Sequence, residues 1–228
     1  MIAMKKDMTI KTYLDFVERV YGLSNDLHFS RRDLFTNIER FIMRALKGIR
    51  IRDNKKITLN LLIAFSWFGS LMNRLHIDIE SGIWRRFPGK CSYCAAVPCA
   101  CLEKKATRRR AFQSDERHRP KTLHEFQMLF ENIYPANART LEKAGIHLAE
   151  EIGELSEAFL AFIGSHEEKA LANIELEAAD LFSCFMGVFN SIDVDIASEI
   201  AAISNHNCHV CKAAPCHCSF KSIMNFKS

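Results

Sequence analysis

The chain has 228 residues, of which 48% are hydrophobic, and its formal net charge is only +4. Glycine and proline are scarce, with nine and five residues, which favours long helices over a turn-rich β-sandwich. No apolar stretch of the signal-peptide type follows the N-terminal residues. The most apolar run, residues 57–72, is too short to span a membrane. We therefore expect an all-α, cytoplasmic protein that does not associate with membranes.

The first segment, residues 1–101, is predicted to be a helical unit in which the apolar run forms a buried helix. The segment ends in four cysteines with the spacing C-x2-C-x4-C-x-C, namely Cys91, Cys94, Cys99 and Cys101. Clustered thiols in a reducing compartment indicate a metal site rather than a disulfide framework.

A basic segment, residues 102–121, follows and is predicted to be a linker. Residues 1–121 carry 25 Lys and Arg against 12 Asp and Glu, whereas residues 122–228 carry 6 against 15. Opposite charges favour docking of the two halves, and the basic half can attract a polyanion. The linker is also a candidate for nucleic-acid binding, but no recognised nucleic-acid-binding motif accompanies it.

The third segment, residues 122–228, is predicted to contain four helices. Its hydrophobic period and its helix breakers place them at about 122–134, 140–163, 166–190 and 193–205. Pro135 stops the first helix and Gly164 closes the second, while Ser165 and Glu168 form a capping-box pattern for the third. This pattern is typical of an antiparallel four-helix bundle.

Two acidic pairs mark the second and third of these helices: Glu151 with Glu154, and Glu177 with Asp180. The i, i+3 spacing places both members of a pair on one helix face, and apolar neighbours place that face near the core. Two such helices packed antiparallel bring four carboxylates together, where unpaired charges are too costly. A hard cation such as Mg²⁺ would neutralise them and would in turn bind phosphates. The alternative is a pair of solvated helix faces.

A second cysteine cluster with the same spacing closes the chain: Cys208, Cys211, Cys216 and Cys218. Each of its cysteines lies 117 residues after a cysteine of the first cluster. At the same offset, Ile77-Asp-Ile79 falls on Val194-Asp-Ile196. We therefore predict two tandem four-helix-bundle-like repeats, each ending in a metal-binding loop of four cysteines.

Each cluster is predicted to hold one structural zinc ion, because four thiolates at this spacing can wrap a tetrahedral metal. An iron–sulfur cluster, redox disulfides and metals shared between the repeats are the alternatives. His209 and His217 lie inside the second cluster and can replace a thiolate. The ninth cysteine, Cys184, is expected to be a buried core thiol.

The two repeats are not equivalent, because none of the four acids has an acidic counterpart 117 residues earlier. The counterparts are Leu34, Asn37, Asn60 and Ile63. The first repeat is therefore predicted to be a degenerate, structural or substrate-binding half that cannot build the same metal site.

The acidic motifs resemble those of the all-α nucleoside triphosphate pyrophosphohydrolases, which include the MazG-like enzymes and the all-α dUTPases. The residues that carry the resemblance are Glu150-Glu-Ile-Gly-Glu-Leu-Ser-Glu-Ala-Phe159 and Glu177-Ala-Ala-Asp-Leu-Phe182, within residues 140–205. The resemblance implies Mg²⁺-dependent cleavage between the α and β phosphates of a nucleotide. The products would be a nucleoside monophosphate and pyrophosphate, and the helical subunits of the family typically assemble into oligomers.

The resemblance also implies roles for individual residues. Glu151, Glu154, Glu177 and Asp180 would be the magnesium ligands, and Glu150 would position or activate water. Family members often carry a Lys and an Asn late in the last helix. Asn205 fits the Asn, whereas Ala201 stands at the position of the Lys.

Three further residues are candidates because of their position and charge. His147 lies one helical turn before Glu151 and is placed to touch substrate. Arg40 and Arg44 lie on a basic helix of the first repeat and are candidates for holding the distal phosphates. A half-buried structural histidine and a solvated helix face are the alternatives.

The sequence therefore predicts a Mg²⁺-dependent nucleotide pyrophosphohydrolase with its active site in the second repeat and a nucleotide as its substrate. Assembly into a homo-oligomer is compatible with this interpretation. Two other functions remain: a non-catalytic nucleotide sensor, which the missing Lys favours, and a zinc-stapled nucleic-acid-binding protein.

Overall fold

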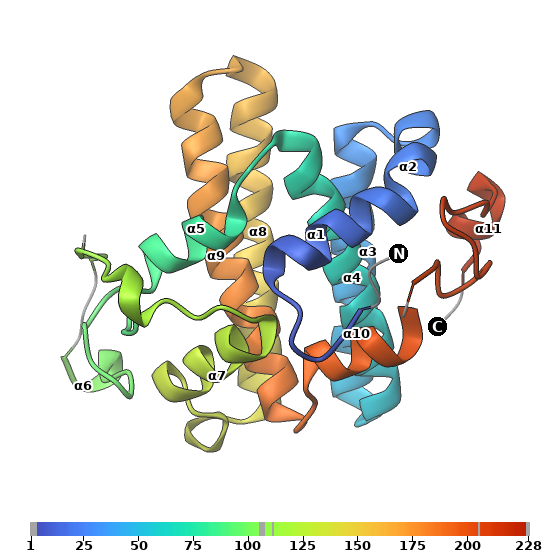
Figure 1. Ribbon diagram of the computed structural model, residues 1–228. Coiled ribbons are helices and arrows are strands. Elements are labelled where there is room, and N and C mark those ends of the chain that lie inside the picture. Colours follow the sequence, from blue (N-terminus) through green and yellow to red (C-terminus); the bar gives the residue numbers. More distant parts are fainter. Residues whose placement is uncertain (1–3, 105–107, 111, 205, 227–228) are drawn as a thin grey trace. The chain divides into compact units, whose positions relative to one another are not determined.

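The computed structural model describes residues 4–104, 108–110, 112–204 and 206–226, and these residues form helices and loops without a β-strand (Figure 1). The predicted all-α class is therefore confirmed. The elements, in chain order, are α1 (Ile10–Val17), the π-helical turn η1 (Glu18–Gly22), α2 (Leu23–His28), α3 (Arg31–Ile51), α4 (Asn54–Leu75), α5 (Ile79–Arg86), α6 (Cys101–Lys104), the 3-10 turn η2 (Glu116–His118), α7 (Leu123–Ile133), the 3-10 turn η3 (Ala136–Ala138), α8 (Leu141–Ser165), α9 (Glu168–Ser191), α10 (Ile196–Ser204) and α11 (Phe220–Met224).

The chain divides into two compact units, and the division differs from the two predicted segments. The first unit comprises Met1–Ile77 and Val194–Ser228, and the second comprises Asp78–Asp193. Residues 78–101, expected to close the first repeat, therefore belong with α7, α8 and α9. Residues 194–228, expected to close the second repeat, belong with α1 to α4.

The second unit is built on the helical hairpin of α8 and α9, which lie side by side in Figure 1. The side chain of Thr140 caps α8 by accepting a hydrogen bond from the Lys143 N–H group. Helix α8 runs through Gly164 and ends at Ser165, and the next residue, His166, has a left-handed backbone with φ 56°. The prediction that Gly164 closes the helix is therefore wrong.

The capping box predicted for the third helix of the last segment is also wrong. Because α8 extends to Ser165, the Ser165 hydroxyl donates back to the Ala161 carbonyl at 3.0 Å, within its own helix. Glu167 is the residue that precedes α9, and its side chain makes no capping hydrogen bond. A capping box does form at α7, between Thr122 and Glu125.

Aromatic rings pack α7 and α5 against the hairpin in the core of the second unit. Phe126 and Phe130 on α7 lie 6.4 and 6.0 Å, between ring centroids, from Phe182 on α9. Phe87, which follows α5, packs edge-on against Phe130 at 5.1 Å. Truncating a buried phenylalanine of this kind typically costs about 3–5 kcal/mol. These contacts hold the end of α5 close to α9.

The first unit is built on the corresponding hairpin of α3 and α4, joined at Arg52 in the left-handed region. Residues 57–72 lie in α4 and are mostly buried, as predicted for the apolar run. Phe65 is a core residue, stacked on Tyr13 at 5.0 Å. Helix α10 begins at Ile196, three residues later than expected.

No single helix in the described ranges is long and apolar enough to cross a membrane. Helices α9 and α10 pass that test only when they are taken together as a bent pair. Much of α9 is buried within its own unit, which accounts for its apolar composition.

Candidate functional site

Three of the four acids predicted to bind magnesium lie together in the second unit. One carboxylate oxygen each from Glu151 on α8 and from Glu177 and Asp180 on α9 lie within 4.8 Å of one another. In an octahedral shell with bonds of about 2.1 Å, adjacent oxygens are about 3.0 Å apart and opposite oxygens about 4.2 Å. A small adjustment of the side chains would therefore let one cation contact all three carboxylates.

Two of these carboxylates have an orphaned oxygen. The Oε2 atoms of Glu151 and Glu177 are buried and have no hydrogen-bond partner within the described part of the chain. Burial raises the pKa of Glu151 to about 8, and the charges of Asp180 and Glu154 act in the same direction. Burial, followed by the charge of Asp180, also raises the pKa of Glu177. A bound cation would remove both penalties, so the donor set fits a hard, oxygen-binding metal such as Mg²⁺.

The other acids of the motifs lie around this cluster. Glu154 is exposed and does not belong to the group of three, but its charge raises the pKa of both Glu151 and Glu177. The Glu150 carboxylate is exposed and lies 3.0 Å from Nδ1 of His147, which is also exposed. Neither Glu150 nor His147 contributes an atom to the cluster.

Two arginines that the sequence analysis did not assign to the site bind Asp180, whose side chain is only 3% exposed. Arg86, the last residue of α5, donates from Nε to Oδ1 at 3.1 Å and from Nη2 to Oδ2 at 2.6 Å. Nη1 of Arg109 lies 2.5 Å from Oδ2. A carboxylate at this depth requires such compensation, because an unpaired buried charge costs several kcal/mol.

The first cysteine loop positions Arg109. The Arg109 guanidinium lies over the ring of Tyr93, 4.7 Å from its centroid. The next residue, Arg110, donates its backbone N–H group to the Ser92 carbonyl at 2.9 Å. The basic composition of residues 102–121 was the only sequence signal for this arginine, since no local pattern shows which acid it binds.

The remaining predicted substrate contacts lie elsewhere. Arg40 and Arg44 are on α3 in the first unit, where they donate to the carbonyls of Ile223 at 3.0 Å and Phe226 at 2.8 Å. Their guanidinium groups are thus engaged by the C-terminal segment. Asn205 lies outside the described residues.

Each cysteine cluster brings four sulfur atoms within 4.8 Å of one another. The Cys91–Cys101 and Cys94–Cys99 sulfur distances are 3.5 and 3.9 Å, and the Cys208–Cys218 and Cys211–Cys216 distances are 3.9 and 3.8 Å. A tetrahedral zinc site with bonds of about 2.3 Å has sulfur atoms about 3.8 Å apart. A disulfide would require about 2.05 Å, so the cysteines are free thiols whose spacing suits zinc.

The two cysteine loops share their backbone hydrogen bonds at the 117-residue offset. Cys91 donates to Ala96, as Cys208 donates to Ala213, and both Ala95 and Lys212 have a left-handed backbone. Backbone N–H groups also point at sulfur, from Ala100 to Cys94 at 3.2 Å and from His217 to Cys211 at 3.4 Å. Such donors stabilise thiolates and orient metal ligands. The side chains of His209 and His217 are not part of the cluster.

Each loop is fastened to its own unit. Cys99 donates its N–H group to the Ile133 carbonyl at 2.8 Å, at the end of α7. Cys216 donates to the Val20 carbonyl at 2.7 Å, within η1. Both clusters therefore connect a loop to a helical core, as a structural metal site does. Cys184 is separate from them, and burial, aided by the nearby charge of Glu151, raises the pKa of its thiol.

The basic linker is partly engaged in ion pairs. Arg119 contacts Glu80 and Glu116, each at 3.2 Å, and Arg117 contacts Asp115 at 2.8 Å. With Arg109 bound to Asp180, these pairs reduce the cationic surface that a nucleic acid would require.

The chain matches no family model, no curated protein and no solved structure. The resemblance to the all-α pyrophosphohydrolases therefore remains a prediction that rests on the two acidic motifs.

Proposed function

We propose that the protein is a Mg²⁺-dependent nucleotide pyrophosphohydrolase that cleaves between the α and β phosphates. The observation that carries the proposal is the convergence of Glu151, Glu177 and Asp180, in which two buried carboxylate oxygens have no partner among the residues that the structure describes. Three carboxylates leave the other positions of an octahedral cation for water and phosphate oxygens, which is how Mg²⁺ is usually held in phosphoryl-transfer sites.

The carboxylates of this site would hold the cation, which when bound would neutralise phosphate charge and lower the pKa of coordinated water. Because burial holds the pKa of Glu151 near 8, this carboxyl keeps its proton at neutral pH until the cation arrives. On this proposal Glu154, whose charge acts on Glu151 from outside the cluster, would complete the ligand set or accept a proton from water.

We assign phosphate binding to Arg86 and Arg109 in place of Arg40 and Arg44. Both already lie against Asp180. A cation on Asp180 would compete with them for the carboxylate, and a guanidinium released from it can bind phosphate oxygens in a bidentate manner. The two arginines would then pair with Asp180 when no cation is bound and bind phosphate oxygens when the cation is present.

The test is to incubate the zinc-loaded protein with a panel of nucleoside triphosphates and Mg²⁺ and to measure pyrophosphate. The proposal predicts pyrophosphate and monophosphate in equal amounts from at least one nucleotide. Glu177→Gln should abolish the release, whereas Glu157→Gln, an exposed change on α8, should not. Folded, metal-loaded protein that releases no pyrophosphate from any nucleotide would reject the enzyme.

A nucleotide sensor is the second candidate, because Asp180 already has two arginine partners and Ala201 replaces the expected Lys. It predicts Mg²⁺-dependent binding of a nucleotide without turnover. Calorimetry with the panel used in the assay distinguishes the two functions, since both bind but only the enzyme forms products.

We further propose that the two halves are tandem copies of one helical unit, each stapled by a structural zinc ion. The hairpins α3–α4 and α8–α9, the helices α10 and α5, and the two cysteine loops correspond at or near the 117-residue offset. On this proposal the copies have exchanged their C-terminal segments, because each copy's last helix and cysteine loop belong to the other compact unit.

A further inference from the structure

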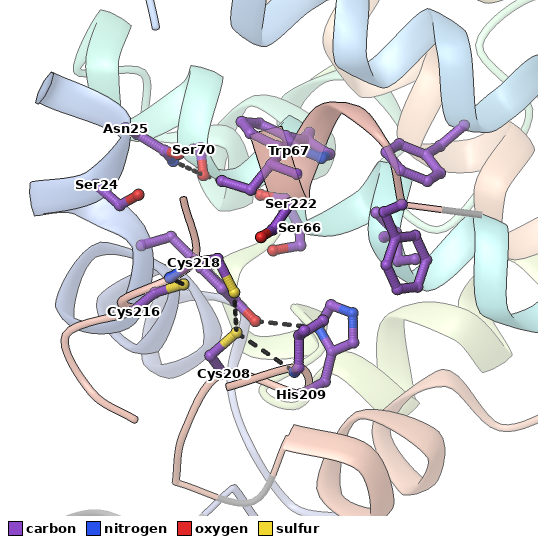
Figure 2. A pocket seen from close by; sticks show the side chains of 16 residues that line it. Ser24, Asn25, Ser66, Trp67, Ser70, Cys208, His209, Cys216, Cys218 and Ser222 are labelled. Carbon is purple, nitrogen blue, oxygen red and sulfur yellow. Dashed lines mark hydrogen bonds between the residues drawn. The ribbon is translucent and has the colours of Figure 1, made fainter. Parts of the chain in front are cut away.

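The first unit contains a half-open cavity of about 80 Å³, which is shown in Figure 2. Its walls come from η1 and α2, from α3 and α4, and from the second cysteine loop with the C-terminal segment that follows it. Ile63, which stands 117 residues before Asp180, is one of the lining residues. One lining residue of the cavity, Ile63, therefore stands at the position that corresponds to Asp180 of the second unit.

The walls of this cavity are rich in aromatic rings. Five rings border it, those of Tyr21, Phe41, Trp67, His209 and Phe226. The other lining residues include serines and an asparagine, but no Asp, Glu, Lys or Arg. Flat aromatic surfaces favour a flat aromatic ligand, which can stack on them or meet them edge-on.

One buried hydroxyl in this cavity lacks a partner. Ser24 is only 6% exposed, and its Oγ atom has no hydrogen bond within the described part of the chain. Figure 2 shows this hydroxyl directed toward the space beside Ser70 and Cys218. Nearby, Asn25 donates to the Ser70 hydroxyl at 3.0 Å, whereas Nε2 of His209, which also lines the cavity, is buried without a partner among the described residues. A buried, unpaired hydroxyl costs free energy unless a ligand supplies its partner.

We infer that this cavity is a binding site for a small, uncharged heteroaromatic molecule. The Ser24 hydroxyl would bond a ring nitrogen or carbonyl of the ligand, and the rings of Trp67 and Phe226 would contact its faces or edges. An anion is disfavoured, because the cavity offers no cation and because a metal-loaded thiolate cluster at its wall carries net negative charge.

The size of the cavity limits how such a ligand enters. A cavity of about 150 Å³ encloses a benzene ring, so 80 Å³ admits only part of a ring unless the wall moves. The C-terminal segment forms one wall, through Ser222, Ile223 and Phe226. We expect one edge of the ring to be buried and the other to remain in the open mouth. The inference does not depend on the pyrophosphohydrolase activity, because it concerns the first unit alone.

Calorimetric titration of the full, zinc-loaded chain tests the inference with adenine and uracil as neutral probes and orotate as the anionic analogue of uracil. At least one neutral probe should bind saturably, and orotate should bind about tenfold more weakly or not at all. In a Trp84→Phe background, the bound probe should quench Trp67, the other of the two tryptophans. Absence of binding by both neutral probes, or equal affinity for orotate, would overturn the inference.

Substitutions at Ser24 locate the site. Ser24→Leu should fill the cavity and abolish binding, whereas Leu27→Ala, on the exposed side of the same helix, should not change it. Ser24→Ala should weaken binding about fivefold through loss of one hydrogen bond, while the melting temperature stays the same or rises. A folded Ser24→Leu protein that binds the probe with wild-type affinity would contradict the assignment.

Discussion

At the scale of single residues, Asp180 is a candidate ligand for a cation and is also the ion-pair partner of two arginines. Its side chain is 3% exposed and binds Arg86 and Arg109, yet one of its oxygens also lies in the cluster with Glu151 and Glu177. The arginines compensate its charge when no cation is present. Burial raises the pKa of both glutamates, although the charge of Arg109 acts in the opposite direction on each.

Removing Arg86 should therefore be costly. We expect Arg86→Ala to destabilise the metal-free site by about 3 kcal/mol, because it leaves a buried carboxylate with one partner instead of two. Adding Asp180→Asn should recover part of that loss, since no charge is then left unpaired. Urea unfolding of the four proteins of this double-mutant cycle measures the coupling.

The matched control is Arg117→Ala, whose pair with Asp115 lies on the surface. It should leave stability unchanged, because exposed ion pairs contribute little. Additive effects of Arg86→Ala and Asp180→Asn would show that the two side chains are not coupled.

The raised pKa of Glu151 predicts how stability depends on pH. Its folded-state value of about 8 lies above the ordinary value of 4.5, so the folded protein binds a proton that the unfolded chain has lost. This contribution to stability is complete below about pH 4.5 and is lost as the pH rises through 8. Melting temperatures of magnesium-free protein should fall over that range, and less steeply in Glu151→Gln.

Comparison of the wild type with Glu151→Gln isolates the contribution of Glu151 to the pH dependence of stability, because both proteins contain the same titrating thiols. Added Mg²⁺ should stabilise the wild type more at pH 8 than at pH 6, since a bound proton competes with the metal. Parallel pH profiles for the wild type and Glu151→Gln would exclude the raised pKa.

At the scale of elements, the cysteine loops join segments that lack a large core of their own. We expect two zinc ions per chain, one in each cluster. Cys94→Ser and Cys211→Ser should each reduce the zinc content to one, because each removes a ligand from a different site. Cys184→Ser should leave two, and metal analysis of the purified proteins gives the counts.

Local patterns predicted several elements well, whereas they did not predict contacts between distant segments. The start of α8 near residue 140 was predicted, and Glu177 and Asp180 lie in one cluster, because both features depend on neighbours within one helical turn. Glu154, the predicted partner of Glu151, stays outside the cluster.

The Ser165 hydroxyl can either cap the following helix or donate back to the Ala161 carbonyl of its own helix. The sequence is compatible with both hydrogen bonds, and the structure shows the second. Arg86 and Arg109 were missed because their partner lies 94 and 71 residues away.

At the scale of the whole molecule, sequence patterns predict two units, but the compact units of the structure comprise other segments than the predicted 1–101 and 122–228. If the halves are copies, the terminal helix and loop of each can pack on either hairpin, as in domain swapping. No pattern within one copy distinguishes these arrangements. In the structure, residues 78–193 form one of the two compact units.

This division predicts which fragment folds alone. Residues 78–193 should fold, bind one zinc ion and retain the contacts of Asp180 with Arg86 and Arg109. Residues 122–228 should not, because they lack the segment that carries both arginines. Circular dichroism and zinc analysis of the two fragments test this prediction. If the 122–228 fragment folds and the 78–193 fragment does not, the division into these two units is wrong.

The most direct test of the account is the binding of a divalent cation to the carboxylate cluster, on which both candidate functions depend. Mn²⁺, a paramagnetic substitute for Mg²⁺, can be titrated into the zinc-loaded protein and followed by electron paramagnetic resonance. We predict saturable binding at neutral pH that Glu177→Gln weakens about tenfold or more and Glu157→Gln leaves unchanged. Absence of saturable binding to the wild type, or wild-type binding by Glu177→Gln, would contradict the account.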